Sequence, residues 1–324
     1  MKASHDVLGI GNAIVDVLAR TDDEFLQLNH LVKGAMSLID ADRAEALYGA
    51  MQSAVECSGG SCANTMAGIA SLGGKAAYIG KVRDDGLGWT FRHDIRAAGV
   101  SFDTPPATSG PPTARCLIFV TEDAQRTMNT YLGACVTLGP ADIDAALVGS
   151  AAVTYIEGYL WDAPDAKAAV LKGMDAAHAA GRKVSMTLSD AFCVDRWRAE
   201  FRELLRTKID ILFANEAELL SLYEATTFDE ALQAARREGK MAALTRSARG
   251  SVVINGEEVH VVDAAPVSKV VDTTGAGDLY AAGFLYGYTR GLPPGECARI
   301  GGVAAAEIIS HFGARPETPL KMLL

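Results

Sequence analysis

Short apolar runs alternate with longer helical patterns along most of the chain. The runs are rich in β-branched and aromatic residues, and each lies next to a helical pattern. This alternation is typical of βαβ units on a parallel sheet. We therefore predict an α/β fold with a mostly parallel central sheet. The expected strands span 76–82, 151–160, 182–188, 210–213 and 241–245.

The segment 251–262 departs from this rhythm. Two alternating apolar stretches flank Asn255-Gly256, a dipeptide that favours a type I′ turn. The pattern predicts an antiparallel hairpin at one edge of the sheet.

Two other segments, about 12–40 and 110–132, do not fit the βα alternation either. The Pro-rich stretch 104–112 leads into the second of them and is typical of a connector rather than of a linker between independent domains. We expect these two segments to form a small separate β-sheet within a single unit that spans residues 1–324.

Composition and charge limit the classes of function. The chain has 324 residues, of which 49% are hydrophobic and 22% charged, so a large core is expected. The net charge of −10 would repel a phosphate backbone or an anionic membrane, which excludes nucleic acid and membrane as expected partners.

The cysteines and the N-terminus indicate a cytoplasmic protein. The first residues lack the features of a signal peptide, and no run is long and apolar enough to span a membrane. The cysteines show neither C-x-x-C spacing nor histidine partners, so we expect reduced thiols and no zinc site. They are Cys57, Cys62, Cys116, Cys135, Cys193 and Cys297.

Two glycine patterns resemble nucleotide-binding loops but fail in detail. Gly9 and Gly11 follow the first strand, yet Ile14 stands at the third glycine position of a dinucleotide fingerprint. The stretch 68–76 has one residue too many for a Walker A loop, and Ala76 replaces the hydroxyl that should reach magnesium. Neither a Rossmann dehydrogenase nor a P-loop enzyme is expected.

The stretch 271–291 carries the most informative chemistry. A β-rich run ends at Asp272-Thr273-Thr274, and Gly275-Ala276-Gly277-Asp278 then opens an apolar helix. Amides at a helix N-terminus form an anion site, and the glycines allow the backbone to approach a ligand closely. Asp278 would point at the same place. Taken alone, the motif favours an Asp278 that serves only to stabilise the helix start, as acidic residues in first turns usually do.

Three ordered motifs resemble signatures of the PfkB, or ribokinase-like, carbohydrate kinases. The string D-T-T-G-A-G-D ending at Asp278 is similar to the C-terminal signature, and Asn215-x-x-Glu218 to an N-x-x-E motif. The segment 59–88 is similar to the N-terminal signature, with one departure at Arg83, where glycine is usual. The matching positions there are Gly59, Gly60, Asn64, Ala67, Ala70, Leu72, Gly73, Gly74, Gly80, Asp85 and Gly88.

The resemblance implies a fold and a mechanism. The fold would be a three-layer α/β/α sandwich with a mostly parallel central sheet, covered by a small β lid made from residues 12–40 and 110–132. Asp278 would act as the catalytic base, and the amides of Gly275, Ala276 and Gly277 would stabilise the transferring phosphoryl group. Such a role suits a weak carboxylate, because phosphoryl transfer depends more on position than on basicity.

The same resemblance implies ATP and Mg²⁺ as cofactors. Glu218, with Asn215, would act on Mg²⁺ through water. The ATP loop would follow the strand 241–245 and differs from the family pattern at Ser247, where glycine is usual. A monovalent cation such as K⁺ would lie beside Asp272 and the 310–315 turn. The remaining residues implied to contact ATP are Thr245, Arg246, Gly250 and Thr274.

The acceptor is expected to be a nucleoside or a sugar. Several stretches, among them 155–162 and 210–223, are more similar to adenosine kinases than to ribokinases, which points to the 5′-hydroxyl of adenosine. A sugar such as ribose or fructose remains open, because Glu157 lies where ribokinases carry an acid. By the resemblance, the hydroxyls of the acceptor would meet Asn12, Asp16, Gly59, Gly60 and Asn64, and the base would meet Met36, Cys116, Leu132 and Tyr159.

A protein of another class remains conceivable from the sequence, namely a non-catalytic regulator that binds a sugar or nucleoside. The intact motif from Gly275 to Asp278 argues against it. The pattern is compatible with a monomer or with a homodimer joined through the lid.

Overall fold

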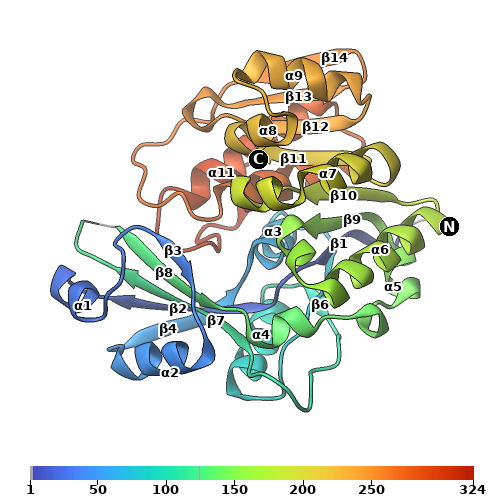
Figure 1. The fold of residues 1–324 in the computed structure, drawn as a ribbon. Coiled ribbons are helices and arrows are strands. Elements are labelled where there is room, and N and C mark those ends of the chain that lie inside the picture. The colour runs from blue at the N-terminus through green and yellow to red at the C-terminus, as the bar shows by residue number, and fades with distance from the viewer. Residues whose placement is uncertain (1–2, 124) are drawn as a thin grey trace.

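A nine-stranded sheet forms the centre of the computed structural model, which describes residues 3–123 and 125–324 (Figure 1). In the described residues, the strand order is β14-β13-β12-β11-β10-β9-β1-β5-β6. The strands are β1 (His5–Ile10), β5 (Ala76–Ile79), β6 (Ser101–Phe102), β9 (Ala151–Glu157), β10 (Lys183–Thr187), β11 (Ile211–Asn215), β12 (Met241–Thr245), β13 (Ser251–Asn255) and β14 (Glu258–Val262).

All neighbouring strands from β6 to β12 are parallel, and β13 and β14 continue the sheet antiparallel. The predicted edge hairpin is therefore present. Its turn lies one residue later than expected, because Asn255 pairs with Glu258 and the two turn residues are Gly256 and Glu257. Of these two, only Gly256 has a positive φ, of 61°, so the turn is not type I′.

Helices cover both faces of this sheet, as the sequence predicts for an α/β/α sandwich. Successive strand residues alternate between two buried clusters: Val7 and Phe213 belong to one, Leu8 and Leu212 to the other. The first cluster lies under α3 (Ser61–Ser71), α4 (Gly86–Ala97), α10 (Ala276–Tyr288) and α11 (Pro294–Ile308). The second lies under α5 (Ala145–Ser150), α6 (Pro164–Ala179), α7 (Ala191–Thr207), α8 (Glu216–Tyr223) and α9 (Phe228–Arg237). Short 3₁₀ helices lie at Gly133–Thr137, Pro140–Asp142, Gly158–Asp162, Ser247–Arg249 and Leu320–Met322.

A smaller sheet lies beside the large one (Figure 1). Within the described residues its order is β3-β8-β7-β2-β4, and α1 (Asp23–Leu28) and α2 (Ala41–Ala50) accompany it. The prediction had not included β4. The strands are β2 (Ile14–Arg20), β3 (Met36–Leu38), β4 (Ala54–Gly59), β7 (Ala114–Val120) and β8 (Arg126–Tyr131).

The turn that carries Arg83 is well ordered by hydrogen bonds. The Arg83 amide donates to Thr113 Oγ1 at 2.9 Å, and residue 83 forms a parallel bridge with Ala107. Arg83 has no positive φ, so an arginine fits where the family signature has glycine.

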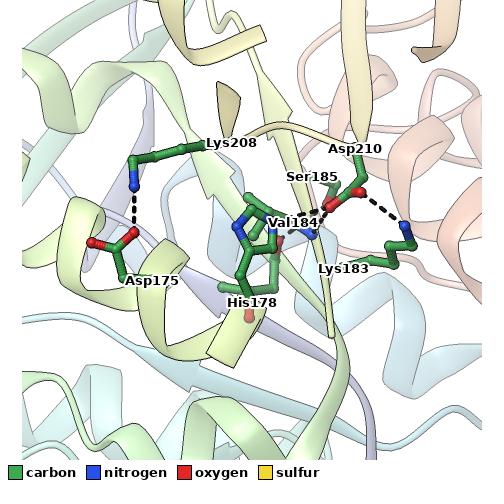
Figure 2. A network of polar contacts seen from close by, with 8 residues as sticks. Asp175, His178, Lys183, Val184, Ser185, Lys208 and Asp210 are labelled. Atoms are coloured by element: carbon green, nitrogen blue, oxygen red, sulfur yellow. Dashed lines mark hydrogen bonds and ion pairs between the residues drawn. The ribbon is translucent and has the colours of Figure 1, made fainter. Parts of the chain in front are cut away.

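A polar network joins three segments at the end of the sheet where β10 begins (Figure 2). Asp210, just before β11, accepts hydrogen bonds from Lys183 Nζ at 2.8 Å, from the Val184 amide at 2.9 Å and from His178 Nε2 at 3.3 Å. Burial alone would raise the pKa of Asp210, but Lys183, the Val184 amide and His178 outweigh it and hold this pKa below its usual range.

We expect Asp210→Asn to lower the free energy of unfolding by about 1–2 kcal/mol at pH 7, because a charged acceptor with three donors is lost. Since the folded-state pKa is lowered, the stabilisation is present at neutral pH and is lost as pH falls through the folded pKa. Urea unfolding at pH 7 and at decreasing pH measures both effects. Asp175→Asn is the control. The Asp175 side chain is 64% exposed, so its ion pair with Lys208 should contribute little to stability. Equal effects of the two substitutions would contradict the prediction.

Candidate active site

A cavity of about 200 Å³ lies where β10, β11 and β12 end and α10 begins. The carboxyl ends of parallel strands are the usual place for ligands in such sheets. The cavity brings together residues from all three sequence motifs. Its lining includes Ser61, Asn215, Glu218, Thr245, Gly275, Ala276, Gly277 and Asp278.

The N-terminus of α10 faces this cavity with unpaired amides. Gly275 caps the helix with a φ of 78°, a conformation that favours glycine, and a Cβ there would lie 3.0 Å from the Cβ of Ala314. The Ala276 amide donates to the Thr273 carbonyl at 3.2 Å. The Gly275 and Gly277 amides make no hydrogen bond to any residue that the structure describes, so they are the ones left for an anion.

Asp278 is held by side chains from α3. Its Oδ1 accepts a hydrogen bond from Ser61 Oγ at 2.6 Å, and its Oδ2 accepts one from Asn64 Nδ2 at 3.0 Å. Burial raises the pKa of Asp278, while Ser61, Asn64 and the charge of Arg315 act in the opposite direction. Asp278 is thus fixed in place across the domain rather than only stabilising the start of its own helix. Ser61 was missed from the sequence, although it lies between the singled-out Gly60 and Asn64.

The two glycines before α3 are required by close contacts. A Cβ on Gly59 would lie 2.4 Å from the carboxyl carbon of Asp16. Gly60 has a φ of 92°, and a Cβ there would lie 2.4 Å from the carbonyl oxygen of Asn12. The pair therefore lets Asp16 and the start of α3 come together beside Asp278.

Asp16 lies on β2, half-buried and close to three charged groups. Burial raises its pKa to about 6, the charges of Arg315 and Arg126 lower it, and the charge of Asp278 raises it. Arg315 itself is bonded to Ser58, whose carbonyl oxygen accepts from its Nη2 at 2.7 Å. Asp16 and Asp278, far apart in sequence, therefore face one site.

Glu157 lies at the end of β9 but does not face the cavity. Its side chain is among the most buried of the polar groups, at 1% exposure. Oε1 accepts from the Asn12 amide and Oε2 from the Cys62 amide, both at 2.9 Å. Burial raises its pKa to about 7, against the effect of these two amides. Glu157 thus joins the end of β1 to the start of α3, and it is not among the residues that line the cavity.

Asn215 and Glu218 form a capping box at the start of α8. The Glu218 amide donates to Asn215 Oδ1 at 2.9 Å, and the Asn215 amide donates to Glu218 Oε2 at 3.0 Å. Glu218 is buried, and burial raises its pKa to about 7, while Asn215 lowers it and the charges of Asp190 and Asp278 raise it. Glu218 lines the cavity and forms no ion pair with any lysine or arginine in the described part of the chain. A buried carboxylate of this kind suits a position that meets a metal ion.

The loop after β12 is ordered, and its arginines are engaged. Arg246 Nε lies 3.5 Å from a carboxylate oxygen of Glu216, and its guanidinium covers the ring of Phe228. Ser247 has a φ of 52°, which explains why glycine is usual in the family at this position. Gly250 is required, because a Cβ there would lie 2.0 Å from the Val262 carbonyl oxygen. Among the residues predicted for ATP in this loop, Thr245 lines the cavity.

Asp272 is paired with an arginine that the sequence analysis did not single out. Its Oδ2 lies 2.8 Å from Nη2 of Arg126, on β8 of the small sheet, and both side chains are buried. The carboxylate also accepts from the Thr274 amide at 3.0 Å and from the Gly313 amide at 3.2 Å. Asp272 is the residue that was predicted to bind a monovalent cation. In this arrangement the positive charge of Arg126 already balances its negative charge.

One face of the small sheet turns toward the site. Direct cross-strand partners share a face. Asp16 pairs with Cys116, and Cys116 pairs with Thr130, so these three side chains lie on the same face. Met36 pairs with Met128 on that face and is 49% exposed.

The other two residues expected to contact the base lie outside these strands. Leu132 follows β8 directly and is half-buried. Tyr159 lies in the 3₁₀ helix after β9, and its hydroxyl donates to the Ser189 carbonyl at 3.4 Å. Burial raises its pKa, so the hydroxyl stays protonated.

No cluster of three or more histidine, cysteine or acidic side chains that could hold a metal ion occurs among the described residues. None of the helices in the described part of the chain has the length and apolar character needed to cross a bilayer.

Comparison with known proteins identifies the family of this chain. The model of the family "pfkB family carbohydrate kinase" matches residues 31–321. A solved structure of adenosine kinase from Sinorhizobium meliloti is 58% identical, with a TM-score of 0.92, covering 99% of this chain and 98% of that one. A probable sugar kinase from Rhizobium etli CFN 42 is 55% identical, also with a TM-score of 0.92 and the same coverage. Adenosine kinase 2 of Arabidopsis thaliana is 26% identical over 97% of this chain and 96% of its own length.

The chain therefore belongs to the pfkB family of carbohydrate kinases. Its ribokinase-like fold and its activity class, a kinase that phosphorylates a nucleoside or a sugar, agree with the predictions from the sequence.

Proposed function

We propose that this kinase transfers the γ-phosphoryl group of ATP to the 5′-hydroxyl of adenosine, giving AMP and ADP. The observation that carries the proposal is the placement of Asp278, fixed by Ser61 and Asn64 beside the free amides of Gly275 and Gly277. The choice of adenosine rests on the 58% identity to an adenosine kinase and on the apolar face of the small sheet.

In the proposed reaction, Asp278 orients the acceptor hydroxyl and takes its proton. The hydroxyl oxygen attacks the γ-phosphorus, the bond from phosphorus to the β,γ-bridging oxygen breaks, and ADP leaves. The Gly275 and Gly277 amides donate to the oxygens of the transferring group, where negative charge is spread in a loose transition state. Because the proton leaves late in such a transition state, the modest basicity of an aspartate is sufficient.

Glu218 is the residue that would hold a magnesium ion through water, with Asn215 positioning its carboxylate. When bound, Mg²⁺ neutralises phosphate charge. An incoming cation would also favour the ionised form of Glu218, whose pKa is otherwise raised to about 7 by burial. This behaviour fits a carboxylate that meets its metal only when the nucleotide arrives.

The acceptor's ribose would lie between the two sheets. Asp16 would accept two hydroxyl donors, and Asn64 has a buried Oδ1 with no partner among the described residues, which supports a polar contact there. The face that carries Asp16 also presents Cys116, Ile118, Met128 and Met36, which suits a flat base. Each oxygen of Glu157 accepts a hydrogen bond from a backbone amide, which supports a structural role for this acid and a nucleoside rather than a plain sugar as the acceptor.

We further propose that the small sheet acts as a lid. Arg126 reaches from it to Asp272, next to the α10 N-terminus, so movement of this sheet would carry a positive charge toward or away from the phosphate site. Closure would exclude water and limit hydrolysis of ATP. The edge strands β3 and β4 have one free side each, so a monomer and a dimer joined through the lid are both compatible with the sheet. All cysteines are free, which supports a reducing, cytoplasmic setting.

A coupled assay of ADP release with ATP and Mg²⁺ tests the proposal. Adenosine, guanosine, inosine, ribose and fructose are compared at equal concentration. We expect selective turnover of adenosine, consistent with a role in purine salvage. Turnover of only a free sugar would overturn the nucleoside assignment while leaving the kinase mechanism intact.

A further inference from the structure

A hollow of about 540 Å³ lies on the exposed side of α4 and is separate from the catalytic cavity. The two hollows share no lining residue. The wall consists of α4 residues together with residues that follow β5. Its lining side chains are Arg83, Asp84, Trp89, Arg92, His93 and Arg96.

Trp89 offers a flat, open surface at this hollow. Its ring stacks on His93 with 5.3 Å between the centroids and 14° between the planes, so one face of the indole is covered. The side chain is nevertheless 70% exposed, which leaves the other face free. An open tryptophan face is well suited to stacking with an aromatic base.

The hollow is positively charged in a chain whose net charge is −10. Three guanidinium groups line it. Arg83 donates to the Gly110 carbonyl, and Arg96 is paired with Asp103 at 2.8 Å. Arg92 is half-buried and makes no hydrogen bond or ion pair with any residue that the structure describes. A guanidinium group in this situation is suited to bidentate binding of a phosphate.

One carboxylate, that of Asp84, also lines the hollow. It would repel a bare anion, but a carboxylate is a good acceptor for the two hydroxyls of a ribose. An aromatic plane, a free guanidinium group and a carboxylate match the three parts of a nucleotide. The volume lies within the range usual for sites of small ligands.

We propose that this hollow is a second nucleotide site, which binds a purine mononucleotide. The base stacks on Trp89, the phosphate binds Arg92 with help from Arg83 and Arg96, and Asp84 accepts from the ribose.

The position of Arg83 makes the site a feature of this chain. Arg83 stands where the family signature has glycine. Its side chain is therefore not part of that signature, and here it forms part of the wall of the hollow. The hollow is also bonded to the segment that leads into the small sheet. The amide of the lining residue Arg83 donates to Thr113 Oγ1 at 2.9 Å, and the carboxylate of the adjacent Asp85 accepts from the Thr113 amide at 2.9 Å, just before β7. On the same helix, Asp94 accepts from the Ser58 amide at 2.7 Å, and Ser58 is bonded to Arg315 beside Asp16.

Equilibrium dialysis with AMP tests the proposal on the intact protein. In Arg92→Ala, the affinity of this hollow for AMP should fall at least about tenfold. At an AMP concentration that fills the wild-type site, we therefore expect the wild type to bind one more AMP per chain than the variant does. The control is Arg237→Ala, which removes the same charge from an exposed position on α9 and should bind as the wild type does. Trp89→Phe should remove the AMP-dependent quenching of tryptophan fluorescence that belongs to this site.

This experiment does not depend on the proposed catalytic function. It measures the difference in bound AMP between the wild type and Arg92→Ala, and both proteins have the same catalytic site. Equal AMP stoichiometry in the wild type and Arg92→Ala would overturn the second site. Binding of an acidic peptide that Arg92→Ala abolishes, without any such loss for AMP, would also overturn it. Unchanged thermal unfolding of Arg92→Ala ensures that a loss of binding is not a loss of fold.

Discussion

Asp278→Asn is expected to lower kcat by about 10³-fold while the affinity for the acceptor stays within a few-fold of the wild type. Removing a general base typically costs 10²–10⁴ in rate. The variant should keep its fold. Asn64 has a buried Oδ1 without a partner in the part of the chain that the structure describes, and a flip of its amide would offer that oxygen to the new side-chain amide. Single-turnover phosphoryl transfer and calorimetric binding of adenosine measure the two quantities separately.

Asp229→Asn provides the matched control for this prediction. Asp229 also lies in the first turn of a helix, α9, but it lines neither hollow. If Asp278 served only to stabilise its helix start, the two variants would lose stability alike and both would keep their turnover. Near-normal turnover of Asp278→Asn would rule out Asp278 as the base.

The catalytic motif was predictable because its chemistry is local. The glycines at 275 and 277, the helix that follows and the acid in its first turn are adjacent in the sequence, and amides at a helix N-terminus are suited to an anion by backbone geometry alone. Ser61 could not be assigned in the same way. Its hydroxyl meets Asp278 only because α3 packs against α10, two helices that are 217 residues apart at this contact.

Glu157 shows the limit of predicting a role from a position. The sequence placed an acid at the end of a strand beside the site, and the structure has it there. Whether such a side chain turns toward a ligand or is covered depends on the path of other segments. Here the chain at Asn12 and Cys62 closes over it, and two backbone amides take both of its oxygens.

The small sheet was predicted only in part, for a similar reason. The segment of β4 reads AVECSG, which has too little apolar alternation to indicate a strand. It becomes one by pairing antiparallel with β2, which brings Gly59 opposite Ile14. The pairing of Arg126 with Asp272 likewise depends on how this sheet sits against the large one, and no spacing in the sequence reports it.

Gly59→Ala is expected to raise the KM for adenosine by about 100-fold with a much smaller change in kcat. The new methyl group would lie 2.4 Å from the carboxyl carbon of Asp16, so that carboxylate must move. Its displacement would weaken the hydrogen bonds from the acceptor's hydroxyls to a charged group. A loss of about 2.8 kcal/mol in all, within the range for one such bond, corresponds to about 100-fold. Gly59 has no positive φ, so backbone strain does not add to the effect.

Steady-state kinetics with varied adenosine at saturating ATP measures this effect, and Gly49→Ala is the control. Gly49 lies within α2, and a Cβ there meets nothing within 4 Å, so that variant should keep its KM and be slightly more stable. An unchanged KM for adenosine in Gly59→Ala would mean that Asp16 does not bind the acceptor. A loss confined to kcat would instead mean that the change reaches Asp278 through α3, because Gly60 and Ser61 follow Gly59 directly and Ser61 donates to Asp278. In the proposed mechanism Asp278 would take the proton and Asp16 would bind only the hydroxyls. The split between KM and kcat therefore tells which of the two carboxylates the methyl group disturbs.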